Sequence, residues 1–249
     1  MVHHVNRDLV KILNILHCTD EDLVQFTKDC SDNHIKPIIH PFWEELPYVN
    51  IYQSIIPDIL HQIYQGIVKH IFSWVVAIYS ASKIDTQCKC FPPNHHIQIF
   101  SKGISTLSQL TGQEHNQMCQ FLLGLIAGAP LPPDLRNPEC IVHAIQAILD
   151  FIYLAQLPVH STTTLDDLEA SLSRFHTNKD VFINLNIHTN MNLLKLHALH
   201  HYAHSIRNYG TIDNYNMEYT KQLHIDLTKE AYRVMNQKDE YIQMMTWLE

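Results

Sequence analysis

Apolar side chains recur every three or four residues along most of the chain, which is the spacing of one face of an α-helix. The first such segment contains Leu9, Ile12, Leu13 and Leu16. Alternating patterns typical of strands are rare, and Val181-Phe182-Ile183 is the one brief strand candidate. The pattern therefore predicts a mainly α fold. Further helices are expected at residues 19–30, 57–80, 113–128, 139–157, 164–178, 192–208, 216–236 and 239–248.

The segment 57–80 is apolar on nearly all sides, so we expect a buried helix. Pro57 suits its first turn, where a missing N–H costs nothing. Lys69 and His70 interrupt the apolar run, which argues against a membrane span. The residues expected to be largely buried are Leu60, Ile63, Ile67, Phe72, Trp74 and Val75, and Leu149, Ile152 and Tyr153 are expected to pack against Leu122 and Leu125.

Local signals mark several ends of these helices. Thr19, with Asp22 at the capping-box distance, and Thr164 are placed to cap the helices that follow them. Residues 129–138 contain four prolines and predict a loop, which could separate two subdomains.

The composition limits the classes of function. Hydrophobic residues make up 46% of the 249 residues and charged residues 17%, which is typical of a folded core. The net charge of −8 gives no general attraction to DNA, so any DNA contact would need a local basic patch. Six cysteines without zinc-ribbon spacing, and no signal-peptide pattern, predict free thiols in an intracellular, non-secreted protein.

Two short segments carry the candidate chemistry. Asp58 and His61 lie three residues apart at the start of the 57–80 helix, and Glu218 lies in the first turn of a helix that Asn216 can cap. Taken alone, each acid is best interpreted as a favourable charge near a helix N-terminus. Carboxylates brought together from distant segments are also what a two-metal phosphoryl-transfer site needs.

Four histidines form the pattern H-x-x-H-H-x-x-H at His197, His200, His201 and His204. The i,i+4 pairs could bind Zn²⁺, which leaves a metal-dependent hydrolase as a minor alternative. No glutamate follows the first histidine as in HExxH, so no hydrolytic base is offered. We therefore expect no bound metal, with His197 and His201 packed inward and His200 or His204 more exposed.

Ten short stretches form an ordered series from about residue 36 to the last residues. These stretches are FWEELP (42–47), PDILHQ (57–62), FPPNHH (91–96), KGIS (102–105), LDFIYLAQ (149–156), FHTNKD (175–180), KLH (195–197), DNYN (213–216), LHIDL (223–227) and KDEY (238–241). Together they resemble the C-terminal part of Plavaka-type transposases, which are fungal and related to the CACTA group. The resemblance divides the chain into an N-terminal helical segment, residues 1–35, and a transposase-like region, residues 36–249.

The resemblance implies a DDE-type recombinase with an RNase H-like core, in which three acids bind two Mg²⁺ or Mn²⁺ ions. Asp58 would be the second acid, His61 its companion and Glu218 the third acid, so Asp58 and Glu218 would be metal ligands. The resemblance also implies a further glutamate three residues on, where this chain has Lys221. The implied partner is transposon-end DNA in the nucleus, and a homo-oligomer is left open.

The resemblance also implies that the first acid and most of the RNase H-like core would precede Met1. The chain would then be a helical insertion-type domain with at most a remnant of that core. We therefore expect a fragment or degenerate remnant that is inactive alone and binds no metal. The alternative is a helical module repurposed for protein or DNA interaction without catalysis.

Overall fold

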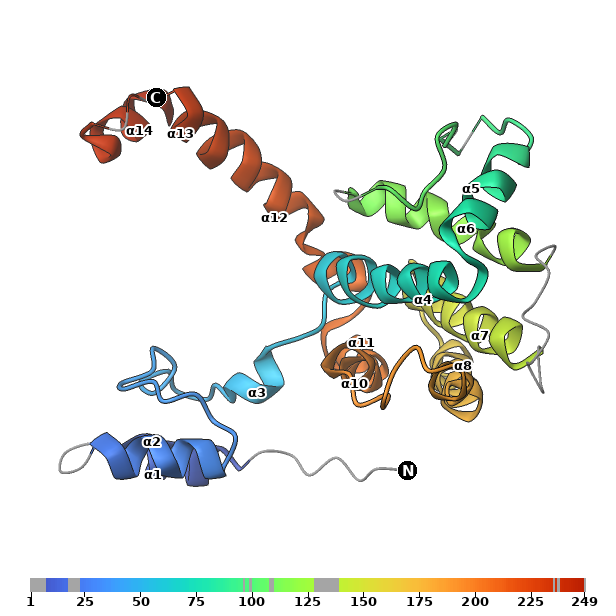
Figure 1. The fold of residues 1–249 in the computed structure, drawn as a ribbon. Helices are drawn as coiled ribbons and strands as arrows, with labels where there is room; N and C mark the ends of the chain where they lie inside the picture. Colours follow the sequence, from blue (N-terminus) through green and yellow to red (C-terminus); the bar gives the residue numbers. More distant parts are fainter. Residues whose placement is uncertain are drawn as a thin grey trace. The chain divides into compact units, whose positions relative to one another are not determined.

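The computed structural model describes residues 8–17, 23–95, 97–98, 100–107, 110–127, 139–234, 236 and 238–248. Nearly every element in these residues is a helix (Figure 1). The only strand-like feature among them is an isolated bridge between Asn94 and Ile97. The predicted mainly α fold is confirmed. The chain divides into two compact units, residues 1–56 and residues 57–249.

The first unit is small. It contains α1 (Leu9–His17), α2 (Leu23–Asp32) and the short α3 (Ile51–Ser54), which Asn50 caps through a hydrogen bond from the Tyr52 N–H. Thr19, the predicted cap of α2, lies outside the described residues. The core of this unit consists of Ile12, Leu16, Phe26 and Cys30.

The second unit is built around one long buried helix. Its first part, η1 (Ile59–Val68), is wound as a π-helix and continues into α4 (Lys69–Tyr79). Asp58 is the N-cap, so Pro57 precedes the helix and does not occupy its first turn as predicted. All six residues predicted to be buried here are 8% exposed or less: Leu60, Ile63, Ile67, Phe72, Trp74 and Val75.

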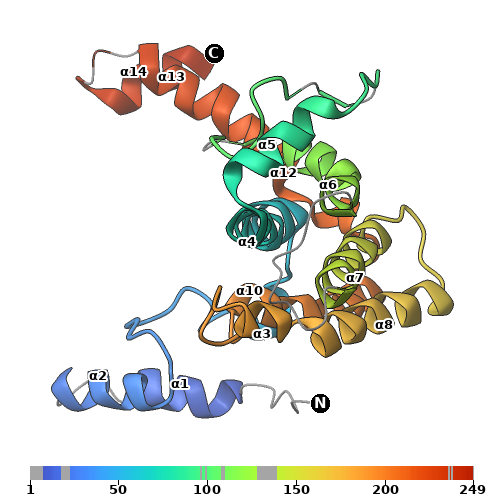
Figure 2. The same ribbon diagram turned by 45° about the vertical axis from the view of Figure 1, so that its right-hand side comes forward.

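Three further helices continue the core: α6 (Gly112–Ala127) contacts η1, α7 (Glu139–Ala155) contacts α6, and α8 (Thr162–Asn178) contacts α7. α7 and α8 lie side by side (Figure 2). Leu149 and Ile152 are buried as predicted, but Tyr153 is 41% exposed. The prediction for Tyr153 was wrong because the next residue along a helix is turned by about 100° from its neighbour, which moves Tyr153 from the core-facing side to the edge of α7.

Two local predictions in this unit are corrected. The N-cap of α8 is Ser161, and Thr164 is its capping-box partner three residues later. The strand candidate at Val181-Phe182-Ile183 forms the short helix α9 (Val181–Asn184), because Phe182 is buried against Trp74, with ring centroids 4.7 Å apart. The predicted loop at residues 129–138 lies outside the described residues.

The remaining helical segments differ from the prediction, and two of them are divided into several short helices. α5 (Ala81–Cys90) has only Ile84 and Cys88 buried, and its polar sequence gave no prediction. The segment predicted as one helix at 192–208 contains α10 (Leu194–Ala198), η2 (Leu199–His201) and α11 (Tyr202–Tyr209). The last elements are η3 (Ile212–Tyr215), α12 (Met217–His224), the π-helical η4 (Ile225–Lys229), α13 (Glu230–Val234) and α14 (Glu240–Leu248).

None of the described helices is both long enough and apolar enough to cross a membrane.

Candidate functional site

Asp58 and His61 are in direct contact at the start of η1. Oδ2 of Asp58 accepts a hydrogen bond from the His61 backbone N–H at 3.1 Å and lies 2.9 Å from His61 Nδ1. The backbone carbonyl of Asp58 accepts a second bond, from the Tyr202 hydroxyl at 2.8 Å. Asp58 is only 8% exposed. The structure therefore places Asp58 as a buried helix cap whose orientation His61 and Tyr202 fix.

The Tyr202 side chain that binds the Asp58 carbonyl is itself tightly packed. It comes from α11, far along the chain, and is completely buried. Burial, the Asp58 charge and Tyr215 together raise the pKa of Tyr202 well above its ordinary value. The hydroxyl therefore stays protonated and remains a donor to the Asp58 carbonyl.

Glu218 lies in the first turn of α12, as predicted. The Asn216 side chain caps this helix by accepting from the Glu218 N–H at 3.1 Å, and it also donates to Glu218 Oε2 at 3.1 Å. Glu218 is half-buried and lines a polar pocket of about 270 Å³ together with Tyr64, Gln156 and Asp213. The Tyr64 hydroxyl donates to Gln156 Oε1 at 2.8 Å.

Gly112 makes room for the Glu218 carboxylate. A side-chain carbon at Gly112 would overlap Glu218 Oε1 and would lie 3.1 Å from Leu60 Cδ1. Glu218 therefore reaches the segment that Asp58 begins, and α12 contacts η1. The fold brings these two distant segments next to each other. That the two carboxylates approach to the 4–6 Å of a shared metal remains a prediction.

The donor set does not fit a complete two-metal site within the described residues. They contain no group of three or more histidine, cysteine, aspartate or glutamate side chains arranged to hold a metal. Oδ2 of Asp58 already accepts a hydrogen bond from the His61 N–H. Lys221 is exposed on α12, one turn beyond Glu218, and adds a positive charge near it. The pocket beside Glu218 adds a second carboxylate, Asp213, to which the sequence assigned no role.

The histidine cluster is arranged differently from the prediction. His197, His200, His201 and His204 are all exposed, so the inward placement of His197 and His201 was wrong. The inward stripe consists instead of Leu196, Leu199, Ala203 and Ile206, which lie at helical spacing and are buried.

His200 pairs with a histidine from another helix. Its ring stacks on His176 of α8, with the two Nε2 atoms 3.0 Å apart. Burial, Lys179 and His200 lower the pKa of His176 to about 4, so His176 is neutral at pH 7. The rings of His197 and His201 meet edge to face, with centroids 5.3 Å apart.

Comparison with known protein families finds one match to part of the chain. Residues 2–75 match the model of the family described as Plavaka transposase. This segment contains Asp58 and His61 and begins earlier than residue 36, where the motif resemblance began. No curated protein and no solved structure matches the chain. Residues 2–75 are thus similar to Plavaka transposases, and two of the quoted motifs, FWEELP (42–47) and PDILHQ (57–62), lie within this match.

Proposed function

We propose that this chain is a helical module of transposase origin that contacts DNA but does not cut it by itself. The family match supports the origin. One observation supports the absence of cleavage: Oδ2 of Asp58 accepts a hydrogen bond from the His61 N–H at the start of η1. A carboxylate that caps the N-terminus of a buried helix in this way stabilises the fold.

In the intact family, two Mg²⁺ or Mn²⁺ ions would activate the attacking oxygen and stabilise the leaving one. Asp58 and Glu218 are the residues of this chain that would contribute ligands, with His61 orienting Asp58. Because the described residues do not supply the rest of such a site, the proposal gives them no step in strand cleavage.

The capping role of Asp58 predicts a specific order of stabilities. Asp58→Asn and Asp58→Ser should leave the free energy of unfolding nearly unchanged, since both side chains cap well, whereas Asp58→Ala should lower it by about 1 kcal/mol. Urea unfolding followed by circular dichroism measures this order. If Mn²⁺ raises the unfolding midpoint of the wild-type chain but not that of Asp58→Asn, Asp58 is a metal ligand and the proposed role is wrong.

The absence of cleavage is tested directly with DNA. The chain, incubated with supercoiled plasmid or transposon-end DNA and Mg²⁺ or Mn²⁺, is expected to produce no more nicked product than Asp58→Ala does. Gel electrophoresis of the products over time is the measurement. Nicking by the wild-type chain that Asp58→Ala abolishes would contradict the proposal and place a working set of acids within these residues.

A further inference from the structure

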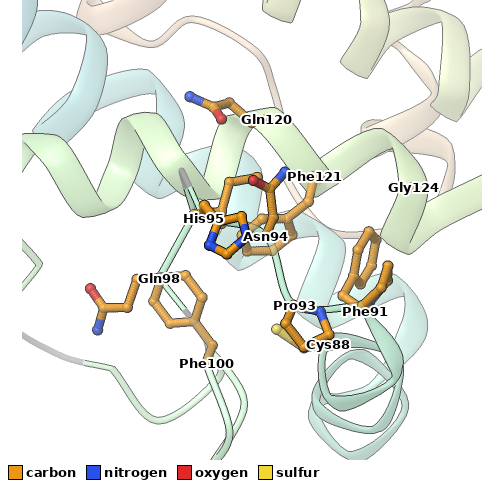
Figure 3. A pocket seen from close by; sticks show the side chains of 12 residues that line it. Cys88, Phe91, Pro93, Asn94, His95, Gln98, Phe100, Gln120, Phe121 and Gly124 are labelled. Atoms are coloured by element: carbon orange, nitrogen blue, oxygen red, sulfur yellow. The ribbon is translucent and has the colours of Figure 1, made fainter.

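A second pocket lies between the end of α5, the loop that follows it and the middle of α6 (Figure 3). Its volume is about 420 Å³, within the usual range for small-molecule sites. It is separate from the pocket beside Glu218, and the two share no lining residue. Phe91 and Phe100 stand on either side of it, with Asn94 and His95 between them (Figure 3).

The walls of this pocket are aromatic. The ring of Phe121 lies 5.5 Å from that of Phe91 and 5.6 Å from that of Phe100, measured between centroids. Gly124 leaves the space that Phe91 occupies, because a side-chain carbon there would lie 2.9 Å from its ring. Burial raises the pKa of the Cys88 thiol to about 11, so this thiol contributes an uncharged surface. A flat aromatic group could stack in this space.

The rim of the pocket carries side-chain amides. Asn94, Gln98 and Gln120 each offer both a donor and an acceptor, and no carboxylate lines the pocket. Asn94 and Gln98 lie on the loop after α5, which hydrogen bonds from backbone N–H groups hold in position. The Gln98 N–H donates to Gln117 Oε1 on α6 at 3.3 Å, and the Ile97 N–H donates to the Asn94 carbonyl at 3.3 Å. Aromatic walls with amides at the edge match a planar ring that has hydrogen-bonding groups on its rim.

The charge along this part of the chain differs from the rest. Residues 81–127 contain three lysines, Lys83, Lys89 and Lys102, and two acids, although the whole chain has a net charge of −8. Both acids are engaged: Asp85 accepts bonds from Ile104 and Ser105, and Glu114 accepts bonds from Thr111. The lysines Lys89 and Lys102 are exposed and flank the pocket segments in the sequence. Exposed positive charges of this kind favour the approach of a phosphate backbone.

We propose that this pocket binds an unpaired nucleobase of single-stranded DNA, stacked on Phe91 and read at its edge by Gln98 and Gln120. Bases without a pairing partner are recognised in this way, by stacking on aromatic rings and by hydrogen bonds to amides. A base fits better than an aromatic protein side chain, because a base also has polar edge groups for the exposed amides of Gln98 and Gln120. The inference rests on the proposed contact with DNA and adds which form of DNA is bound.

Fluorescence anisotropy at low salt can test this with three labelled DNAs of equal length: a single strand, an abasic strand and a duplex. The full chain should bind the single strand at least about fivefold more tightly than the abasic strand, since stacking one base contributes about 1–3 kcal/mol. Phe91→Ala should remove this preference. Tyr153→Ala, which removes an equally exposed aromatic ring elsewhere in the unit, should retain it.

A second pair of variants tests the amides. Gln120→Leu should weaken binding of the single strand and leave the abasic strand unaffected, whereas Gln146→Leu on the exposed side of α7 should change neither. Thermal unfolding of each variant confirms that it folds. Equal affinity for the single and abasic strands, or a preference that survives both Phe91→Ala and Gln120→Leu, would overturn the base pocket while leaving DNA contact intact. Failure to bind any of the three DNAs would overturn the proposed function as well.

Discussion

Replacing Trp74 with alanine is expected to lower the free energy of unfolding of the second unit by about 3–5 kcal/mol, the usual loss for a large buried aromatic side chain. Trp74 is 2% exposed and packs on Phe182. Its indole Nε1–H donates to His188 Nε2 at 2.7 Å, so the substitution also removes the partner of His188. Urea unfolding followed by circular dichroism measures the loss.

The matched control is Leu194→Ala, which removes an apolar side chain that is 86% exposed in the same unit. Its effect should stay within about 0.5 kcal/mol. Trp74→Phe should fall between the two, because it keeps most of the packing but cannot donate to His188. If Trp74→Ala costs no more than Leu194→Ala, the helix η1–α4 is not the centre of this core.

Gly103→Ala is expected to destabilise the second unit by about 2 kcal/mol or more, from backbone strain and lost hydrogen bonds together. Gly103 has a φ of +88°, and a side-chain carbon there would overlap the Asp85 carboxyl group. That carboxyl group accepts bonds from the N–H groups of Ile104 and Ser105, both at 2.9 Å, and from the Ser105 hydroxyl. The substitution therefore disturbs the whole turn.

Acid sensitivity gives a second measure of the same turn. Burial opposes ionisation of Asp85, but the hydrogen bonds from Ser105 and Ile104 outweigh it and the pKa is lowered. Asp85 thus stabilises the fold above its unfolded pKa, and the contribution is lost as pH falls through the lower folded pKa. Gly103→Ala should reduce this acid-dependent loss, while Ser101→Ala on the exposed side of the turn should not. An unchanged pH profile in Gly103→Ala would contradict this role for Asp85.

The sequence predicted helices well where apolar residues keep a wide stripe, as in 57–80 and 139–157. It failed where a local pattern could not decide. Phe182 lies in a short β-branched run that is helical in the structure, where Phe182 packs on Trp74 and α9 contacts α7. α5 has just two buried residues, Ile84 and Cys88, which is too narrow a stripe to stand out.

The candidate site shows the same limit. The contact between Asp58 and His61 follows from their spacing on one helix turn. Tyr202, which donates to Asp58, lies on α11, and Gln156, which shares a pocket with Glu218, lies in the turn after α7. Both are far along the chain from the residues they meet, so their contacts could not be predicted. Asp213 was part of a quoted motif, and its place beside Glu218 emerges only from the fold. For the histidines, counting the apolar residues Leu196, Leu199, Ala203 and Ile206 would have predicted exposure.

The matched segment and the folding units end at different places, which affects recombinant expression. Residue 75, where the family match ends, lies in the middle of α4, beside Trp74. A protein trimmed there would retain half of a buried helix and expose its apolar face, a common cause of insoluble product. Trimming between residues 56 and 57 would keep the larger core in one piece, which makes residues 57–249 the better choice for crystallisation or NMR.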